Sequence, residues 1–320
     1  MGFTSWLRGL LGNEAEEAAP PVAEESSEVS VEEPAPDLPE EIVTPEEAEE
    51  EPRRPHKLVS GILGVAWMTD VGSVRDHNED GLFILIGEQQ SDAPLPPFGL
   101  FVLADGMGGH QAGEVASAIA TRTVAGHLLA HVYQPLLRSA DHTATQPSLT
   151  EIVSDALLEA NRDVSQTVPG SGTTLTCGLV IGNRLFIGHV GDSRAYLWRA
   201  QEPVKMLTTD HSVVTQLVEI GQLTSEEAAV HPQRNMLYRA IGQGVALEVD
   251  VSTHALQSGD LLVLCSDGLW GLLPDEKMWS IISAASTLDE ACVGLVDAAN
   301  AAGGNDNITV ILVEMRQDIT

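Results

Sequence analysis

The pattern of hydrophobic and polar residues changes near Leu58 and divides the chain into two parts. From there on, short apolar or β-branched runs alternate with amphipathic stretches, which predicts strands and helices respectively. The predicted strands cover 62–68, 81–87, 99–104, 174–181, 184–190, 194–199, 245–253, 261–266 and 308–314. The predicted helices cover 112–131, 149–166, 211–220, 275–284 and 288–302. The second part of the chain therefore has the pattern of a folded domain.

The order of these segments predicts an α+β fold. Turns as short as Gly182-Asn183 separate neighbouring strands, which favours antiparallel pairing. The helices gather in the first third of the domain and after residue 270, instead of alternating with every strand. That order is typical of layered α+β proteins. The stretch 139–148 predicts a loop between two helices.

The first part of the chain has a different composition. Residues 13–56 are rich in Glu, Pro, Ala and Ser, and residues 1–56 contain 16 acidic and 3 basic side chains. Such a segment cannot bury enough apolar surface to offset the entropy lost on ordering, and its charges repel one another. We therefore predict a disordered acidic tail over 13–56 and a folded domain over 57–320.

Residues 1–12 differ from the tail that follows them. Five large apolar residues recur there at the spacing of one helical face: Phe3, Trp6, Leu7, Leu10 and Leu11. Two interpretations stay open, a short amphipathic helix that docks on a membrane surface or partner, and a stretch without a role. Arg8 is the only basic residue, so attraction to anionic lipid would be weak. Trp6 also stands where the myristoylation pattern requires Ser or Thr.

Charge and cysteine content narrow the class of protein. The formal net charge of −31 argues against binding a nucleic-acid backbone, because that requires clusters of Lys and Arg. The three cysteines, Cys177, Cys265 and Cys292, are far apart, which predicts buried free thiols in a reducing compartment. No apolar stretch reaches the roughly 18 residues of a membrane span. We expect a monomeric, cytoplasmic protein without a transmembrane segment that does not bind nucleic acid.

Five aspartates in Gly-rich or small-residue turns are the strongest functional candidates: Asp80, Asp105, Asp192, Asp267 and Asp306. Most follow an apolar run, so a strand would deliver the carboxylate to a turn at its end. Oxygen ligands without Cys suit hard divalent cations such as Mg²⁺ or Mn²⁺. Two such ions can share a bridging carboxylate, activate a water and hold a phosphoryl oxygen. The pattern favours a metal-dependent hydrolase.

Neighbouring residues sharpen this hypothesis towards phosphate chemistry. The glycine of Asp105-Gly106 lets a backbone carbonyl approach closely enough to serve as a further ligand. Arg75 has the planar fork that holds two phosphate oxygens, and it lies a few residues before Asp80. Each feature alone has a simpler explanation, since Asp-Gly pairs are common in surface turns and a single Arg is most often a surface charge. Their combination points to a site that cleaves phosphate esters.

Seven ordered motifs resemble those of the metal-dependent Ser/Thr protein phosphatases of type 2C (PPM), especially the compact bacterial members. The motifs are 69–75 with 79–80, 104–110, 172–174, 189–194, 231–235 with 240–242, 266–269 and 304–307. The resemblance covers about residues 62–315. It implies a central β-sandwich of two antiparallel sheets flanked by α-helices on both sides. It also implies hydrolysis of phosphoserine and phosphothreonine by direct attack of a metal-bridging water on phosphorus, in opposition to a Ser/Thr kinase.

The resemblance also implies a role for each candidate at the core of the site. Asp105 would bridge two Mn²⁺ or Mg²⁺ ions. Asp267 and Asp306 would complete the coordination of the first ion, and the Gly106 carbonyl would bind the second ion.

Further roles follow from the same resemblance. Glu79 and Asp80 would hold waters on the second ion. Asp192, with Asp267, would bind a third ion. Arg75 would grip the phosphate of a phosphorylated protein. A mobile flap over 205–240, with His231, Arg234 and Tyr238, would lie beside the site and select substrates.

Three positions depart from the family pattern. One is Tyr238, which stands where relatives often carry Thr. Met107 stands where eukaryotic members often place a His, so the proton donor for the leaving alkoxide stays unassigned and a metal-bound water is one candidate. Trp270 stands where a small polar residue is expected, and it would either line the approach to the metals or belong to the core.

Two functions of other classes remain as alternatives. One is a catalytically silent relative that serves as a binding module, against which the complete set of carboxylates and Arg75 argues. The other is a different two-metal phosphohydrolase, for example one acting on nucleic acid, which the acidic net charge disfavours.

Overall fold

The computed structural model describes residues 54–316, apart from 90, 92–93, 109–110, 139–146, 200–201 and 245. The helix predicted for 1–12, nearly all of the tail predicted for 13–56 and most of the loop predicted for 139–148 lie outside the described residues. The first strand, β1 (His56–Val59), pairs with β2. Because β1 begins at His56, the folded part starts one residue inside the segment that we assigned to the tail.

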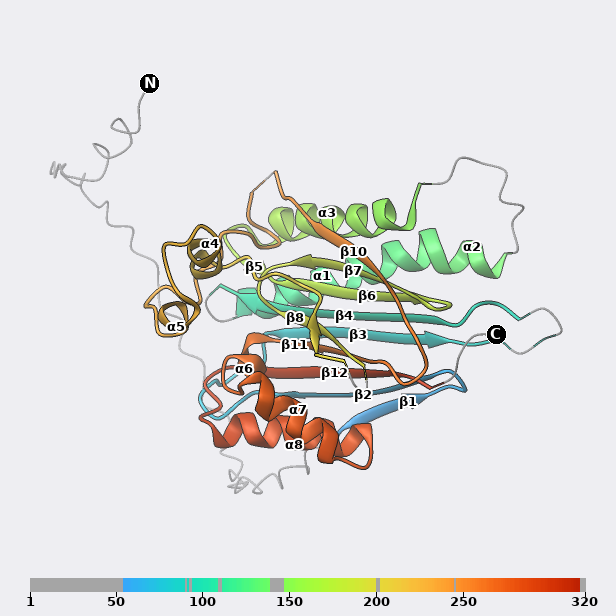
Figure 1. Ribbon diagram of the computed structural model, residues 1–320. Helices are drawn as coiled ribbons and strands as arrows, with labels where there is room; N and C mark the ends of the chain where they lie inside the picture. Colours follow the sequence, from blue (N-terminus) through green and yellow to red (C-terminus); the bar gives the residue numbers. More distant parts are fainter. Residues whose placement is uncertain are drawn as a thin grey trace, which may run out of the picture. The chain divides into compact units, whose positions relative to one another are not determined.

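Two antiparallel sheets form the centre of the folded part (Figure 1). One sheet has the strand order β1, β2 (Leu63–Asp70), β12 (Ile308–Met315), β11 (Leu261–Cys265), β8 (Arg194–Trp198) and β9 (Lys205–Met206). The other has the order β10 (Asp250–Ala255), β7 (Arg184–Val190), β6 (Leu175–Ile181), β4 (Phe98–Met107) and β3 (Asp80–Gly87), with β5 (Gly172–Thr173) paired to β4. The sequence prediction of antiparallel sheets is confirmed.

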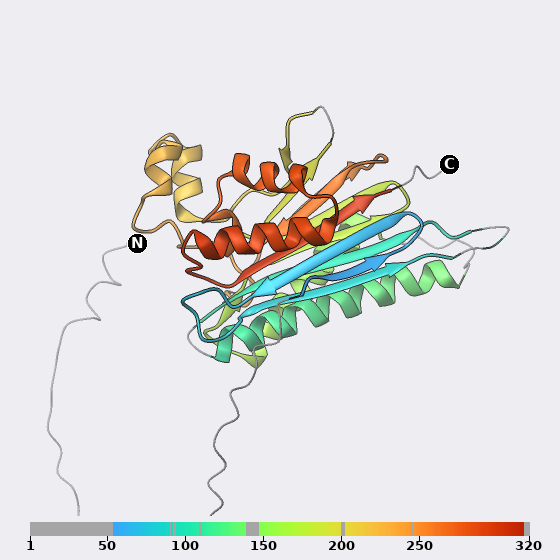
Figure 2. The ribbon, with the colours of Figure 1, turned by 90° about the horizontal axis from the view of Figure 1, so that it is seen from below.

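Helices cover the outer face of each sheet (Figures 1 and 2). Against the sheet that contains β4 lie α1 (Gln111–Leu128) and α3 (Leu149–Thr167). A π-helical turn, η2 (Leu129–Tyr133), joins α1 to α2 (Gln134–Leu137). Against the sheet that contains β11 lie α7 (Asp275–Ala284) and α8 (Leu288–Ala301). The predicted order of layers, α-β-β-α, is confirmed.

Strand β4 shows why its sequence is almost continuously apolar. Leu100 and Val102 belong to the core under α1 and α3, whereas Phe101 and Leu103 belong to the core between the two sheets. Successive side chains of a strand point to opposite faces, so a strand with a core on both sides needs apolar residues at every position. This doubly buried strand is the rigid support of Asp105.

The antiparallel register brings the candidate aspartates to one end of the sandwich. Asp80 begins β3 and lies directly opposite Asp105 near the end of β4. In the other sheet, Cys265 at the end of β11 lies opposite Arg194 at the start of β8 and opposite Val310 near the start of β12. The residues next to these positions, Asp192, Asp267 and Asp306, therefore meet at the same end.

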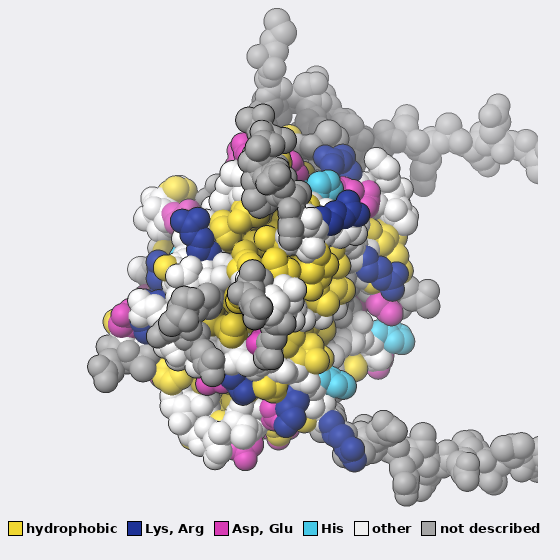
Figure 3. All heavy atoms as spheres, turned by 90° about the vertical axis from the view of Figure 1, so that its right-hand side faces the viewer, with side chains coloured by type: hydrophobic (Ala, Val, Ile, Leu, Met, Phe, Trp, Pro, Cys, Tyr) yellow, Lys and Arg dark blue, Asp and Glu magenta, His cyan; other side chains and the backbone are white. Residues whose placement is uncertain are grey.

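The opposite end of the sandwich has a different surface. Figure 3 shows mainly hydrophobic side chains in the middle of that face, with charged side chains distributed around them. Where described residues are visible on this face, the charged side chains are scattered and not gathered. No helix in the described part of the chain combines the length and the apolar character needed to cross a membrane.

Several boundaries differ from the sequence prediction. The strand predicted for 245–253 begins only at Asp250, and β5, β9, α5 (Ser225–Ala229) and α6 (Asp267–Trp270) were not predicted. These four elements are two to five residues long, which is too short to establish a hydrophobic period. The helix predicted for 211–220 is α4 (Val213–Glu219), which Ser212 caps by accepting from the Thr215 backbone.

Candidate metal centre

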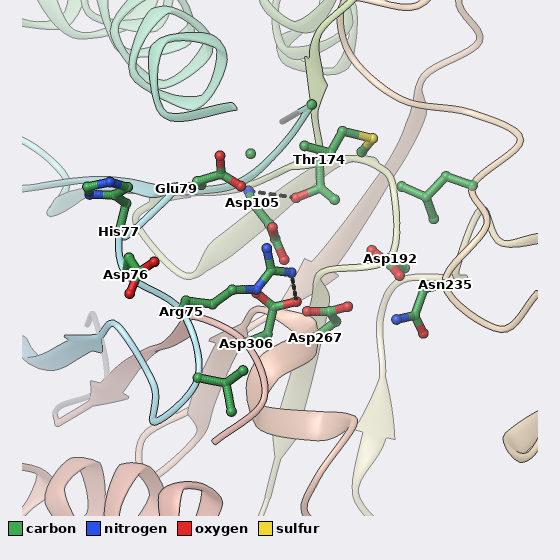
Figure 4. A pocket seen from close by; sticks show the side chains of 15 residues that line it. Arg75, Asp76, His77, Glu79, Asp105, Thr174, Asp192, Asn235, Asp267 and Asp306 are labelled. Carbon is green, nitrogen blue, oxygen red and sulfur yellow. Dashed lines mark hydrogen bonds and ion pairs between the residues drawn. The ribbon is translucent and has the colours of Figure 1, made fainter. Parts of the chain in front are cut away.

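A cavity of about 410 Å³ lies at the end of the sandwich where the aspartates meet (Figure 4). Its lining includes six of the predicted site residues: Arg75, Glu79, Asp105, Asp192, Asp267 and Asp306. Gly106 also lines the cavity. Asp80 lies directly behind it, because it is paired with Asp105 and accepts a hydrogen bond from Ser266 at 2.9 Å. The structure thus brings the predicted acidic residues and Arg75 together.

Backbone hydrogen bonds fix Asp105 and Gly106 in place. The Asp105 N–H donates to Thr174 Oγ1 at 2.9 Å, and the Asp105 carbonyl accepts from Thr173 Oγ1 at 2.8 Å. The Gly106 N–H donates to the Glu79 carbonyl at 3.1 Å. Because the neighbouring backbone is tied on both sides, the Asp105 carboxylate has little freedom to leave the cavity.

Asn307 holds the loop that carries Arg75 and Glu79. Its Nδ2 donates to the carbonyls of Val71 at 2.9 Å and His77 at 2.8 Å. Its Oδ1 accepts from the Glu79 N–H at 2.8 Å. The sequence motif around Asp306 contained Asn307 without a role, and the structure shows that it joins the two loops.

Burial, and after it mutual repulsion, raises the pKa values of the carboxylates. Burial raises the pKa of Asp80 to about 7 and that of Asp267 to about 6, and the charges of neighbouring aspartates act in the same direction. The pKa values of Asp105 and Asp192 are raised well above the usual range. Burial is the larger cause, and repulsion from nearby aspartates, including Asp267, is the second. A buried cluster of like charges stores unfavourable energy that a divalent cation would relieve.

The donor set fits a hard cation. Among the described residues, Asp80 Oδ1 and Asp267 Oδ1 are the buried side-chain oxygens without a hydrogen-bond partner. Carboxylate and backbone carbonyl oxygens are the ligands that Mg²⁺ and Mn²⁺ favour. Within the part of the chain that the structure describes, no three His, Cys, Asp or Glu side chains already form a closed ligand set. The fit therefore rests on the chemistry and burial of the donors.

Arg75 reaches into the same cavity from the loop after β2 (Figure 4). Its Nη2 donates to Asp306 Oδ2 at 2.7 Å, and its side chain is 47% exposed. Burial lowers the pKa of its guanidinium, but attraction to Asp306 outweighs this and leaves that pKa raised. The guanidinium is thus permanently charged, anchored at one end, and accessible from the cavity.

Trp270 and His211 support the turn that carries Asp192. Trp270 Nε1 donates to the Asp192 carbonyl at 3.0 Å. The Gly191 N–H donates to His211 Nδ1 at 3.0 Å, so the neutral ring carries its proton on Nε2, which lies 3.2 Å from Asp250 Oδ2. Burial lowers the pKa of His211, which favours this neutral form. The role of His211 could not be predicted from the sequence, because its partners Gly191 and Asp250 are distant along the chain.

The two interpretations of Trp270 both hold in part. Its indole packs on the core under α7 and α8, while it also lines a second cavity beside the carboxylates. The Arg194 guanidinium lies over the ring at 3.6 Å from its centroid. Trp270 is therefore a wall between the core and the neighbourhood of the site.

The segment predicted as a flap contributes other residues than those we named. Asn235 and Leu237 line the carboxylate cavity, together with Met107. Arg234 lines the second cavity. His231 accepts from the Gln233 N–H in a local turn.

Tyr238 turns its ring towards His211, with ring centroids 5.7 Å apart. Its backbone N–H donates to the His211 carbonyl at 3.0 Å. Both contacts lie within the flap, because His211 belongs to the same segment, and it is the His211 N–H that joins the flap to the Asp192 turn by donating to the Gly191 carbonyl at 2.8 Å.

Gly106 permits a close approach that no other residue allows. A Cβ at this position would overlap the Gly113 carbonyl and lie 2.7 Å from the Glu79 carbonyl, and both obstacles are backbone.

We expect Gly106→Ala to lower the free energy of unfolding by about 1–3 kcal/mol. Urea denaturation measures this loss. Gly126→Ala in α1 is the control, because nothing lies within 4 Å of its added Cβ and Ala favours a helix. Equal stability of both variants would contradict this account.

The raised pKa values predict a dependence of stability on pH. A carboxyl with a folded pKa above its unfolded value binds its proton more tightly in the folded state. Its stabilising effect is therefore present at low pH and lost as the pH rises through the folded pKa. From the unfolded pKa of 3.8 to the folded value of about 7 for Asp80, the metal-free protein should lose stability.

This loss is measured by urea denaturation in a chelator at pH 5 and pH 7.5. Asp80→Asn should have a shallower slope than the wild type, because it lacks one of the titrating groups. Addition of Mn²⁺ at pH 7.5 should restore stability through binding to the folded state. Identical slopes of wild type and Asp80→Asn would show that Asp80 does not titrate as described.

Comparison with known proteins places this site in a family. A family model described as "Protein phosphatase 2C" matches residues 68–308. The chain is 38% identical to the serine/threonine phosphatase Stp of Listeria innocua over 252 residues, which are 77% of this chain and 93% of that protein. The crystal structure of the Mycobacterium tuberculosis serine/threonine phosphatase PstP superimposes with a TM-score of 0.66 and 32% identity, and covers 80% of this chain and 100% of that one. The catalytic domain of PstP in complex with two manganese ions matches with a TM-score of 0.64 and 31% identity, over 80% of this chain and 99% of that one. The chain thus belongs to the protein phosphatase 2C family.

Proposed function

We propose that this protein is a metal-dependent phosphatase that hydrolyses phosphoserine and phosphothreonine in other proteins. One observation carries the proposal. Five aspartates from separate turns and Arg75 converge at one end of the sandwich, in and directly behind a single cavity. The names of the relatives, which are serine/threonine phosphatases, support the choice of substrate class.

We assign the metal ligands on the chemistry and burial of the donors. Asp105, Asp267, Asp306 and the Gly106 carbonyl would hold two Mn²⁺ or Mg²⁺ ions, the number bound in the PstP complex. These ions would polarise phosphoryl oxygens and activate a water.

Outer positions follow from their place around the cavity. Asp80 and Glu79 lie beside Asp105 and Gly106, where they would orient waters. Asp192 lies on the side of the cavity that faces Asn235, and with Asp267 it would hold a third ion (Figure 4).

Arg75 would bind the substrate phosphate. Its guanidinium is exposed to the cavity, and its permanent charge attracts a phosphate dianion. The pairing with Asp306 holds the side chain in the direction of the cavity before substrate arrives. Phosphate binding on the remaining N–H donors therefore costs little side-chain entropy.

The reaction converts a phosphate ester and water into an alcohol and inorganic phosphate. The water oxygen forms a bond to phosphorus, the bond to the Ser or Thr oxygen breaks, and that oxygen gains a proton. Met107, which lines the cavity, has no proton to give. Arg75 would stabilise the charge that gathers on the phosphoryl oxygens.

Four features of the biological setting are predictions from the sequence. They comprise a cognate Ser/Thr kinase, a cytoplasmic location, a monomeric state and a domain arrangement of acidic tail plus phosphatase domain. Deletion of residues 1–53 with unchanged kinetics on a phosphopeptide would exclude a role of the tail in access to the site.

One assay distinguishes this function from the two alternatives. Purified protein with Mn²⁺ is given a phosphothreonine peptide, p-nitrophenyl phosphate and DNA in separate reactions. We expect turnover of the first two and loss of both on chelation. No turnover of any substrate over a range of Mn²⁺ and Mg²⁺ concentrations would indicate a silent relative, and cleavage of DNA alone would indicate a nuclease.

A further inference from the structure

A second cavity, of about 430 Å³, adjoins the carboxylate cavity. It lies between the flap helices α4 and α5 and the short helix α6. Asn235 and Asp267 line both cavities, so the two adjoin at these residues. A molecule bound at the carboxylates could therefore extend into the second cavity.

The lining of the second cavity is suited to an apolar group. Six of its side chains are apolar: Met206, Val214, Val218, Ala228, Ala229 and Trp270. Two of its charged side chains neutralise each other, because Arg194 donates from Nε and Nη2 to Asp210 at 3.0 and 2.8 Å. A third, Asp267, belongs to the carboxylate cluster that the two cavities share. Arg194 also stacks on Trp270, which fixes the aromatic wall. Arg234 is a further cation in the lining, and it lies on an exposed loop.

The flap around this cavity exposes unusually many large apolar side chains. Five of the eleven exposed large hydrophobic residues in the described part of the chain lie between 206 and 238: Met206, Ile220, Val230, Met236 and Tyr238. Concentrated apolar exposure on one segment marks a surface that contacts a partner. We take this partner to be the protein substrate, because its phosphate would bind in the adjoining cavity.

We propose that the second cavity is a subsite for an apolar side chain of the substrate, two residues from the phosphorylated residue. In an extended peptide, side chains two positions apart point the same way and lie about 7 Å apart. An apolar residue at −2 or +2 would thus point to the same side of the peptide as the phosphoresidue, where the second cavity adjoins the first. This inference rests on the proposed phosphatase function and adds a sequence preference to it.

The test uses phosphothreonine peptides that differ at one position. Leu is compared with Ala at −2, −1, +1 and +2, and kcat/KM is measured with Mn²⁺ present. We expect Leu to be favoured roughly tenfold at −2 or +2, which is typical of a few methylenes in an apolar pocket, and no preference at −1 and +1. p-Nitrophenyl phosphate, which has no flanking residues, reports phosphatase chemistry independently of the subsite.

Two variants test whether the preference for Leu over Ala arises in the second cavity. Val218→Ser makes the lining polar and Ala228→Leu fills the space, so both should bring the Leu:Ala ratio close to one. Val59→Ser is the matched control, because Val59 lies on β1, is 57% exposed and lines neither of the two cavities. It should keep the wild-type ratio. Thermal unfolding checks that each variant is folded.

Each outcome decides something. A ratio near one at −2 and +2 in the wild type, with p-nitrophenyl phosphate turned over, would overturn the subsite and leave the phosphatase function standing. A preference that survives in the folded Val218→Ser and Ala228→Leu variants would also overturn it. If no substrate is turned over, the proposed function fails, and the subsite fails with it.

Discussion

Asp105→Asn should reduce hydrolysis of a phosphothreonine peptide by about a thousandfold or more. Asn keeps the size of the side chain but removes the charge that a bridging ligand needs, and Asp105 is the carboxylate proposed to serve both ions. The expected loss lies in kcat, because metal-dependent activation of water is used in the chemical step. Steady-state kinetics at saturating Mn²⁺ measure it.

Two controls separate this effect from misfolding. Asp297→Asn removes an exposed carboxylate on α8 that does not line the cavity, and should keep wild-type activity. The Asp105→Asn protein itself should be at least as stable as the metal-free wild type at pH 7.5, because one buried charge has been removed. Wild-type turnover by a folded Asp105→Asn protein would remove Asp105 from the mechanism.

Arg75→Lys should lower kcat/KM on the same peptide by about a hundredfold. Lys keeps the positive charge but replaces a planar fork by a single ammonium group, so it cannot hold two phosphate oxygens at once. It also loses the geometry of the Arg75–Asp306 pair, which directs the guanidinium into the cavity. Kinetics of the wild type, Arg75→Lys and Arg75→Ala measure the series.

Inhibition by inorganic phosphate provides the second readout for Arg75. If Arg75 binds the phosphate group of the substrate, the inhibition constant of inorganic phosphate should rise in both variants, and it should rise more in Arg75→Ala. A lower turnover with an unchanged phosphate inhibition constant would instead assign Arg75 to the support of Asp306.

The sequence was most informative where the chemistry is local. Asp105-Gly106 and Asp267-Gly268 signalled a close backbone approach, and the structure shows that a Cβ at Gly106 or Gly268 would overlap neighbouring backbone. The apolar run before Asp105 predicted a buried strand, which β4 confirms. The alternation of apolar segments with short turns was sufficient for the layer order, because antiparallel pairing follows from hairpin-length connections.

Contacts between distant segments could not be predicted in the same way. The direct opposition of Asp80 and Asp105 depends on strand register, and the tie between Asn307 and the Arg75 loop joins residues more than 200 positions apart. The flap shows the same limit. From the resemblance we named His231, Arg234 and Tyr238 in the flap. Asn235 and Leu237 line the carboxylate cavity instead, because the turn at 231–237 decides which side chains face inward.

The most direct test of the central claim is to locate bound metal. Crystals of the protein soaked in Mn²⁺ are measured at the manganese absorption edge, so that anomalous density marks the ions themselves. We predict two strong peaks in contact with Asp105, with Asp267 and Asp306 on one of them and the Gly106 carbonyl on the other, and no such pair of peaks in Asp105→Asn. Peaks that all lie away from Asp105, or an undisturbed pair in Asp105→Asn, would contradict the account, whereas an additional peak at Asp192 and Asp267 would be the proposed third ion.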